Sequence, residues 1–263
     1  MKADWVLYPR VTVAILAKQK EVSLPPYLAA IEALDYPKSR ISLYVRTNNN
    51  TDATADILQD WLNRVGNEYE HVSYDGRNVP EQVERFATHE WNGERFKVLG
   101  AIRQKSMAHA LARHSDYYFV CDVDNYIKPN TLKSLVGVGL TIVSPLLLHG
   151  TYPSSLYSNY HAAIDANGYY ADTPLYMELL ERRVCGLVQV PVVHCTYLIQ
   201  SEVIPKLSYD DDSYRYEYVV FSDSARKAGV PQYLDTREVY GYLTMDESPE
   251  SIAQTATRAK GLT

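Results

Sequence analysis

The chain lacks an excess of positive charge, a cysteine pattern and a long apolar run. Its 263 residues include 26 Lys and Arg against 32 Asp and Glu, so the net charge of −6 offers no broad basic field to nucleic acid or an anionic membrane. The three cysteines show no Cys-x-x-Cys spacing, which argues against a disulfide framework or a zinc site and favours a reducing compartment. The longest apolar stretch, residues 135–148, is too short to span a bilayer.

Glycine-rich phosphate-binding motifs are also missing. Neither Gly-x-Gly-x-x-Gly nor Gly-x-x-x-x-Gly-Lys-Ser/Thr occurs, which argues against a dinucleotide fingerprint, a P-loop and a nucleotidyltransferase. A phosphate-bearing ligand must then be held by a local site, and we expect a metal ion there. Tyrosine, by contrast, is abundant, with 23 Tyr against 4 Phe, and its flat face and hydroxyl suit both sugar-binding clefts and wet surfaces.

Strand and helix patterns alternate in the first half of the chain. Apolar or alternating runs predict strands, and apolar residues at helical spacing behind capping residues predict helices. This order favours an α/β fold with a mostly parallel, Rossmann-like sheet and helices on its faces. The predicted strands are 11–17, 41–46, 69–74 and 117–121, and the predicted helices are 24–34, 57–65 and 98–114.

The second half is less regular. We interpret residues 1–263 as one domain, in which a nucleotide-binding half at about 10–128 precedes an acceptor-side half at about 129–245. The polar residues 75–94 are expected to leave the core, and residues 210–212 are expected to form a solvated acidic turn. The other predicted elements are strands at 142–148 and 239–243, one or two strands within 188–199, and helices at 173–183 and 214–227.

Two carboxylates, Asp122 and Asp124, follow directly after an apolar strand. In open α/β sheets ligands bind beyond the carboxyl ends of the strands, where Ala17, Lys18 and Asn48 are also expected. Carboxylate oxygens are hard ligands that suit Mg²⁺ or Mn²⁺ carrying a diphosphate, whereas unpaired buried carboxylates are costly in a core. The alternative is a loop that caps the following helix, and this would not need two extra carboxylates.

Six short motifs lie in order along nearly the whole chain, from about residue 11 to 245. They are Ala14-Ile15-Leu16-Ala17-Lys18, Leu34-Asp35-Tyr36-Pro37-Lys38-Ser39-Arg40, Asp122-Val123-Asp124-Asn125, Leu156-Tyr157-Ser158-Asn159-Tyr160, Val190-Pro191-Val192-Val193-His194 and Tyr240-Gly241-Tyr242-Leu243. Together they resemble the N-terminal glycosyltransferase domain of the procollagen galactosyltransferase family. The resemblance implies a GT-A fold, a nucleotide-sugar donor such as a UDP-sugar, and a divalent metal ion held by Asp-x-Asp.

Three features depart from that family's pattern. The animal enzymes carry a second glycosyltransferase domain after this one, and this chain stops. Asn48 stands where the family shows an acidic residue, which affects the expected ribose or base contacts. Val239 stands where we expect a histidine, so a metal site here is either incomplete or uses His194.

Glycosyl transfer is helped by a cation on the two phosphates of the leaving UDP. We assign Asp124 to Mn²⁺ or Mg²⁺, Asp122 to the metal or the ribose, and His194 to the metal. His194 lies inside an apolar run and is equally consistent with a hydrogen-bonded core residue. Arg103 either pairs with the diphosphate or holds Asp122 in place, or it is an ordinary arginine on a helix surface.

An inverting transfer also needs one carboxylate as general base. Glu217, near the start of a predicted helix where the family shows an acidic pair, is the first candidate and Asp223 is its rival. Both are also consistent with solvated or dipole-compensating helix acids, and for Asp223 we favour that interpretation. Tyr157 and Asn159 either line the sugar side of the cleft or belong to a packed loop.

The sequence therefore predicts a metal-dependent GT-A glycosyltransferase that moves galactose or glucose from UDP to an acceptor hydroxyl. That hydroxyl belongs to a hydroxylysine-bearing protein, another sugar or a lipid-linked glycan. The alternative is a catalytically silent module that binds a glycan or protein partner. Residues 1–5 contain no apolar signal core, so we expect a cytoplasmic location, or the secretory-pathway lumen if the chain is part of an animal-type enzyme.

Overall fold

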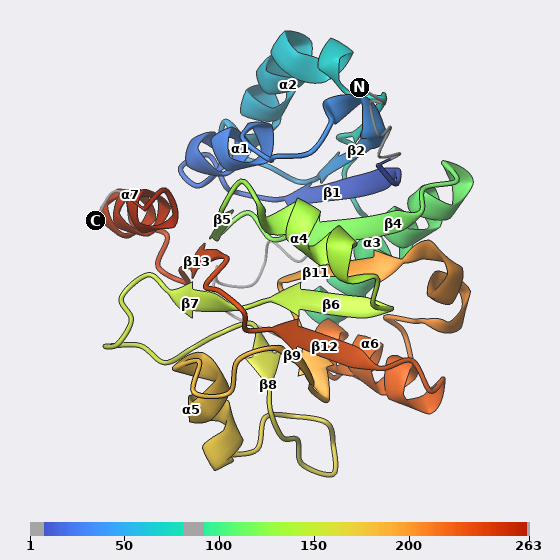
Figure 1. The fold of residues 1–263 in the computed structure, drawn as a ribbon. Coiled ribbons are helices and arrows are strands. Elements are labelled where there is room, and N and C mark those ends of the chain that lie inside the picture. The colour runs from blue at the N-terminus through green and yellow to red at the C-terminus, as the bar shows by residue number, and fades with distance from the viewer. Residues whose placement is uncertain (1–7, 81–91, 262–263) are drawn as a thin grey trace, which may run out of the picture.

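The computed structural model describes residues 8–80 and 92–261. The N-terminal residues 1–5, and residues 81–91 of the predicted excursion at 75–94, lie outside the described residues. Figure 1 shows a central sheet that runs through the whole molecule, with helices on either side of it.

The central sheet has eight strands among the described residues, in the order β3-β2-β1-β4-β11-β6-β12-β9 (Figure 1). Strands β3, β2, β1 and β4 are parallel, as the sequence predicted. Strand β11 is antiparallel to both β4 and β6, and β12 is parallel to β6 and antiparallel to β9. The strands are β1 (Val11–Ala17), β2 (Ile41–Thr47), β3 (His71–Asp75), β4 (Tyr117–Cys121), β6 (Ile142–Pro145), β9 (Leu187–Gln189), β11 (Thr196–Gln200) and β12 (Gln232–Asp235).

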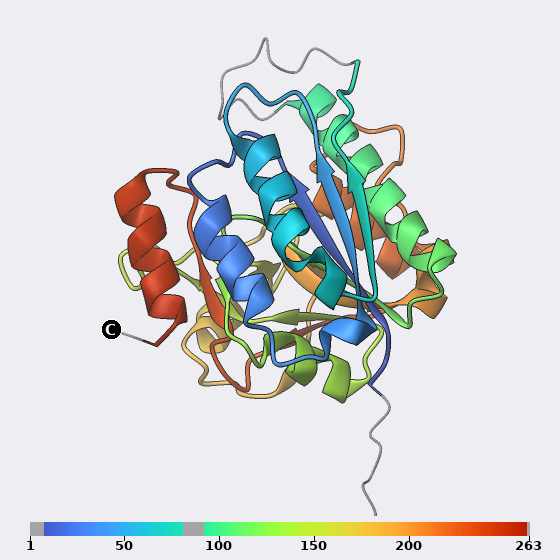
Figure 2. The same ribbon diagram turned by 90° about the horizontal axis from the view of Figure 1, so that it is seen from above.

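Apolar cores form on both faces of this sheet, because the parallel strands are apolar on both sides. On one face lie α1 (Leu24–Glu32), α2 (Thr54–Val65), α4 (Thr131–Val138) and α7 (Pro249–Ala259). On the other lie α3 (Gly93–Ala112), α5 (Pro174–Leu180) and α6 (Glu217–Lys227). Figure 2 shows α7, α1 and α2 side by side, with α3 across the sheet from them. None of the described helices is long and apolar enough to cross a membrane.

Two small sheets complete the fold. A three-stranded sheet contains β5 (Asn125–Ile127), β13 (Gly241–Leu243) and β7 (Leu147–His149) in that order, and α7 packs against it. Strands β8 (Tyr160–His161) and β10 (Val192–Val193) form an antiparallel pair. Short 3₁₀ helices cover Lys38–Arg40, Gly66–Glu68 and Ser201–Lys206.

The structure divides two of the predicted strands. Residues 142–148 form β6 and β7, which belong to different sheets. Residues 188–199 contribute to three strands, because Pro191 has no amide to donate and Cys195 has a left-handed backbone, with φ of 62°. Strand β12 and helix α7 were not predicted, although Ile252, Ala256 and Ala259 of α7 are buried at helical spacing.

Candidate active site

Three parallel strands end at the same edge of the sheet. Ala17 of β1 lies opposite Thr47 of β2, and β4 runs parallel on the other side of β1. The residues that follow these strands, Lys18, Asn48 and Asp122, therefore share one edge. Open α/β sheets bind ligands at such an edge, so the structure brings together the strand ends from which the sequence predicted a nucleotide site.

Asp122 is held by a buried arginine from α3. Arg103 Nη2 donates to both carboxylate oxygens of Asp122, at 2.8 and 3.0 Å, and Arg103 Nε lies 3.5 Å from Glu217 Oε1. The backbone of Asp122 is fixed as well, because its amide donates to the Cys195 carbonyl at 3.0 Å. Of the roles predicted for Arg103, the contact with Asp122 is present, and the arginine joins Asp122 to Glu217.

Asp124 faces a lysine that the sequence did not single out. Lys20 Nζ lies 3.7 Å from Asp124 Oδ2 and 2.5 Å from Glu247 Oε1. Burial raises the pKa of Asp124. The positive charge of Lys20 opposes this increase and the negative charge of Asp122 adds to it, so that the pKa of Asp124 is about 6. Burial acts to lower the pKa of Lys20, but the carboxylates around it outweigh burial and raise it. An ammonium thus takes the position of a counter-ion to Asp124.

His194 is buried at the same edge and is neutral. Burial, together with the nearby His161 and Arg103, holds the pKa of His194 well below its ordinary value. Its Nδ1 lies 2.9 Å from the Cys195 sulfur, and its ring packs on Tyr218 with centroids 4.8 Å apart. These contacts are those of a core histidine that is partnered on several sides.

The donor set fits a hard divalent cation in its chemistry, because Asp122, Asp124 and Glu247 offer carboxylate oxygens. Each of them, however, is already paired with Arg103 or Lys20. Within residues 8–80 and 92–261 no group of three or more His, Cys, Asp or Glu is arranged to hold a metal ion. Asp122, Asp124 and His194 therefore do not form the predicted three-ligand site as the side chains stand.

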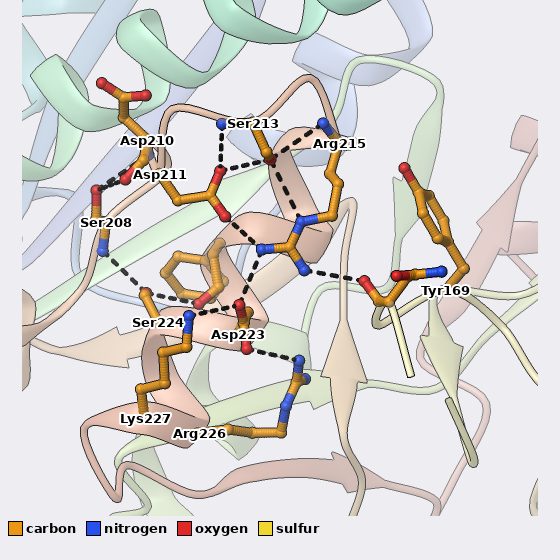
Figure 3. Close-up of polar contacts among 12 residues, drawn as sticks. Tyr169, Ser208, Asp210, Asp211, Ser213, Arg215, Asp223, Ser224, Arg226 and Lys227 are labelled. Carbon is orange, nitrogen blue, oxygen red and sulfur yellow. Dashed lines mark hydrogen bonds and ion pairs between the residues drawn. The ribbon is translucent and has the colours of Figure 1, made fainter. Parts of the chain in front are cut away.

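Glu217 and Asp223, the two candidate bases, lie in different surroundings on α6. Glu217 opens the helix, is 6% exposed and has its pKa raised, chiefly by burial. Asp223 is six residues further on, about 9 Å along the axis. Its carboxylate contacts Arg215 at 2.9 Å, Lys227 at 3.0 Å and Arg226 at 3.5 Å (Figure 3). Only Glu217 shares a cation with Asp122.

Asp211, in the acidic turn at 210–212, belongs to this second network. Figure 3 shows the guanidinium of Arg215 between Asp211 and Asp223, while Lys227 and Arg226 contact Asp223 as well. Arg215 and Lys227 together lower the pKa of Asp223 against the effect of burial. Residues 210–212 are exposed, as the sequence predicted, and within this turn the side chain of Asp211 is paired with Arg215.

The other residues for which the sequence predicted a role are Asn159 and Tyr157, which follow β7, and the three residues at the strand ends. Asn159 is fully buried, and its side chain bonds Ser144 Oγ, the Pro145 carbonyl and the Leu147 amide, which bridges the break between β6 and β7. Tyr157 is 39% exposed, with its ring 5.9 Å from that of His194.

Ala17, Lys18 and Asn48 lie at the strand ends. The Asn48 side chain is buried and donates to Asn49 Oδ1 at 3.0 Å. Nothing in these contacts tests the nucleotide-binding role predicted for the three residues.

Residues 8–259 match the family model described as glycosyltransferase family 25, N-terminal domain. The chain belongs to this family. The resemblance inferred from the short motifs is thereby confirmed.

Two family members, one named as a galactosyltransferase and one named as inactive, show the same sequence identity to the chain. Procollagen galactosyltransferase 2 of Homo sapiens is 35% identical over 255 residues, which cover 94% of this chain and 40% of the relative. The inactive glycosyltransferase 25 family member 3 of Homo sapiens is 35% identical over 250 residues, which cover 90% of this chain and 41% of the relative. The chain spans about 40% of the length of these curated relatives.

Solved structures of two glycosyltransferases share the fold. S. aureus TarS 1-349 in complex with UDP-GlcNAc aligns with a TM-score of 0.59 and 14% identity, over 93% of this chain and 60% of that one. The mannosyltransferase PcManGT from Pyrobaculum calidifontis, in complex with GDP-Man and Mn²⁺, aligns with a TM-score of 0.53 and 15% identity, over 90% and 59%. The GT-A fold predicted from the sequence is confirmed.

Proposed function

We propose that this domain transfers a hexose from a UDP-sugar to an acceptor hydroxyl. The observation that carries the proposal is the pairing of Asp122 with Arg103 and of Asp124 with Lys20 at the carboxyl edge of β1 and β4. Open α/β sheets bind ligands at this edge, and carboxylates that can hold a divalent cation suit a nucleotide diphosphate. Family membership and the UDP-GlcNAc named for TarS support a nucleotide-sugar donor.

The chemistry assigns a role to each acid. Asp122, fixed by Arg103, accepts hydrogen bonds from the ribose hydroxyls. Asp124 would hold a Mn²⁺ or Mg²⁺ ion, which would supply positive charge to offset the negative charge on the leaving diphosphate. The acceptor oxygen attacks the anomeric carbon, the bond from that carbon to the phosphate oxygen breaks with its electrons leaving on UDP, and Glu217 takes the hydroxyl proton.

The donor sugar is galactose or glucose, and the acceptor is the hydroxyl of a hydroxylysine-bearing protein or of a glycan. The similarity to the procollagen galactosyltransferases supports galactose and a protein acceptor. Residues 1–263 act as one GT-A unit, in which the half at about 129–245 supplies the acceptor side. The cytoplasmic location expected from the N-terminal residues stays a prediction.

Glu217→Gln tests the assignment of the base. We expect transfer from UDP-galactose or UDP-glucose, measured as UDP release with a hydroxylysine peptide or a simple glycoside, to fall about 100-fold. UDP binding measured by calorimetry should stay within about threefold. Asp223→Asn should retain most of the turnover, and Lys133→Met, in the exposed pair with Asp35, serves as control. Loss of turnover in Asp223→Asn with an active Glu217→Gln would reverse the assignment.

The second candidate is a catalytically silent module that binds a glycan or a protein. A specific observation favours it, because a relative named inactive is 35% identical to this chain, as the galactosyltransferase is. Such a module would neither hydrolyse UDP-hexose nor bind UDP in a Mn²⁺-dependent way. Either activity in the purified domain would exclude it.

A further inference from the structure

The cation next to Asp124 is a side chain of the protein itself. The Lys20 ammonium contacts Glu247 at 2.5 Å and Asp124 at 3.7 Å, and the lysine side chain is only 20% exposed. Solvated surface lysines rarely have two acidic partners and so little exposure. The two carboxylates that flank Lys20 are the hard ligands that a divalent ion would use.

The backbone around Lys20 is fixed by hydrogen bonds to the start of α2, to the start of α1 and to the loop that follows β2. Its amide donates to Thr54 Oγ1 at 2.6 Å, and its carbonyl accepts from the Leu24 amide at 2.9 Å at the start of α1. The preceding Gln19 has a left-handed backbone, with φ of 54°, and its amide donates to Asn50 Oδ1 at 3.0 Å. The side chain therefore starts from a fixed point beside Asp124, and only its flexible carbons need to move to release the ammonium.

The charges at this edge do not balance. Four carboxylates and three cations lie at this edge, which leaves a net charge of −1 when all are ionised; the acids are Asp122, Asp124, Glu217 and Glu247, and the cations are Lys20, Arg103 and Lys18 at the end of β1. Such an edge attracts a divalent cation and repels a bare diphosphate. An ammonium within a few ångströms of the same oxygens competes directly with the divalent ion.

Building on the proposed function, we propose that Lys20 makes metal binding at this site depend on the nucleotide. In the nucleotide-free domain the ammonium takes the cation position between Asp124 and Glu247 and excludes a divalent ion. When a nucleoside diphosphate binds, Lys20 turns to its phosphate oxygens and leaves the two carboxylates to the metal ion. The coupling is reciprocal, because each ligand raises the affinity of the other by the same factor.

The test is the binding of Mn²⁺ to the nucleotide-free domain, followed through the electron paramagnetic resonance signal of free Mn²⁺. Lys20→Met removes the charge and keeps much of the side-chain volume, and Lys20→Arg keeps the charge. Lys133→Met removes a lysine of α4 from its exposed pair with Asp35 and is the matched control. Circular dichroism establishes that each variant is folded. The titrations are then repeated with saturating UDP.

We expect Lys20→Met to bind Mn²⁺ about tenfold or more tightly than the parent without nucleotide, while Lys20→Arg and Lys133→Met stay within about twofold of it. UDP should raise the Mn²⁺ affinity of the parent more than that of Lys20→Met. Equal nucleotide-free affinities in the parent and Lys20→Met would overturn the inference. If UDP bound to neither protein, the proposed function and the coupling would both fall, whereas the nucleotide-free comparison would still decide whether Lys20 excludes the metal.

Discussion

Arg103 is a buried charge on which two acids depend. Its side chain is 5% exposed, and its Nε and Nη1 atoms have no hydrogen-bond partner among the described residues. Burial acts to lower the pKa of the guanidinium, but neighbouring groups, Asp122 foremost, raise it well above its ordinary value. The arginine is therefore ionised, and it offsets the charge of the equally enclosed Glu217 as well as that of Asp122.

Arg103→Met should destabilise the fold strongly. The substitution leaves Glu217 without its cation in a buried place, and breaking a buried ion pair in this way costs about 3 kcal/mol or more. Urea unfolding followed by tryptophan fluorescence measures the change. Arg64→Met, which removes an exposed partner of Glu32, should leave the midpoint almost unchanged. Equal small effects of both substitutions would show that Glu217 is not held by Arg103.

His161 should make the free energy of unfolding depend on pH in the acid range. Burial lowers the pKa of His161 from 6.5 to about 4, so folding favours the neutral ring. The stability from this residue is fully present above about pH 6.5 and is lost as the pH falls towards 4. His161→Phe should abolish this pH-dependent loss of unfolding free energy, which amounts to about 3 kcal/mol. Urea unfolding at several pH values between 7 and 4 tests it: parallel losses in parent and variant would contradict the shift.

At the scale of elements, a close backbone contact fixes β13 against β5. A Cβ atom on Gly241 would lie 2.3 Å from the Tyr126 carbonyl oxygen and 2.9 Å from the Ile127 Cα. Only glycine permits this approach. The contact matters for the site, because the chain leads from β13 to Thr244, whose amide bonds the Asp124 carbonyl at 3.1 Å, and on to Glu247.

Gly241→Ala should therefore push β13 away from β5. We expect a loss of about 1–3 kcal/mol in unfolding free energy, typical of overpacking, measured by urea unfolding. Gly137→Ala in α4 is the matched control, since among the described residues no atom beyond its chain neighbours and its own helix backbone lies within 4 Å of its Cβ position, and it should be neutral or gain up to about 1 kcal/mol. A neutral Gly241→Ala would mean that the strand can shift without loss.

At the scale of the whole molecule, the two halves predicted from the sequence share one sheet. Strand β4 pairs in parallel with β1 and antiparallel with β11. Both apolar cores mix residues from the two halves, since one contains Val11 and Leu198 and the other Ala14 and Phe221. The halves at about 10–128 and 129–245 are therefore expected to unfold together.

UDP with Mn²⁺ should shift one cooperative transition. At a UDP concentration 100 times its dissociation constant, binding to the native state adds about 2.7 kcal/mol. For a chain of this size that raises the melting temperature by about 5–10 °C. Scanning calorimetry measures the shift, with uridine as the control that lacks the diphosphate. Two transitions, of which only one responds to UDP, would mean that the halves unfold separately.

Local sequence patterns predicted the helices and strands that surround the site. They failed where one apolar run contributes strands to two different sheets. The apolar run of β1 and the strand before Asp122 were predictable because fully buried strands consist of apolar residues. The division of residues 142–148 between two sheets was not, because both pieces are apolar and only the partner strands distinguish them. Helix α7 was missed although its buried face follows helical spacing.

The sequence by itself determined the family, the parallel first half and the place of Asp122 and Asp124 at a strand end, because each depends on residues adjacent in the chain. Only the tertiary structure decided which cations meet those acids. Arg103 reaches Asp122 from 19 residues away, and Lys20 meets Glu247 across 227 residues. Charges act through distance in space, and packing brings these residues together independently of their order along the chain.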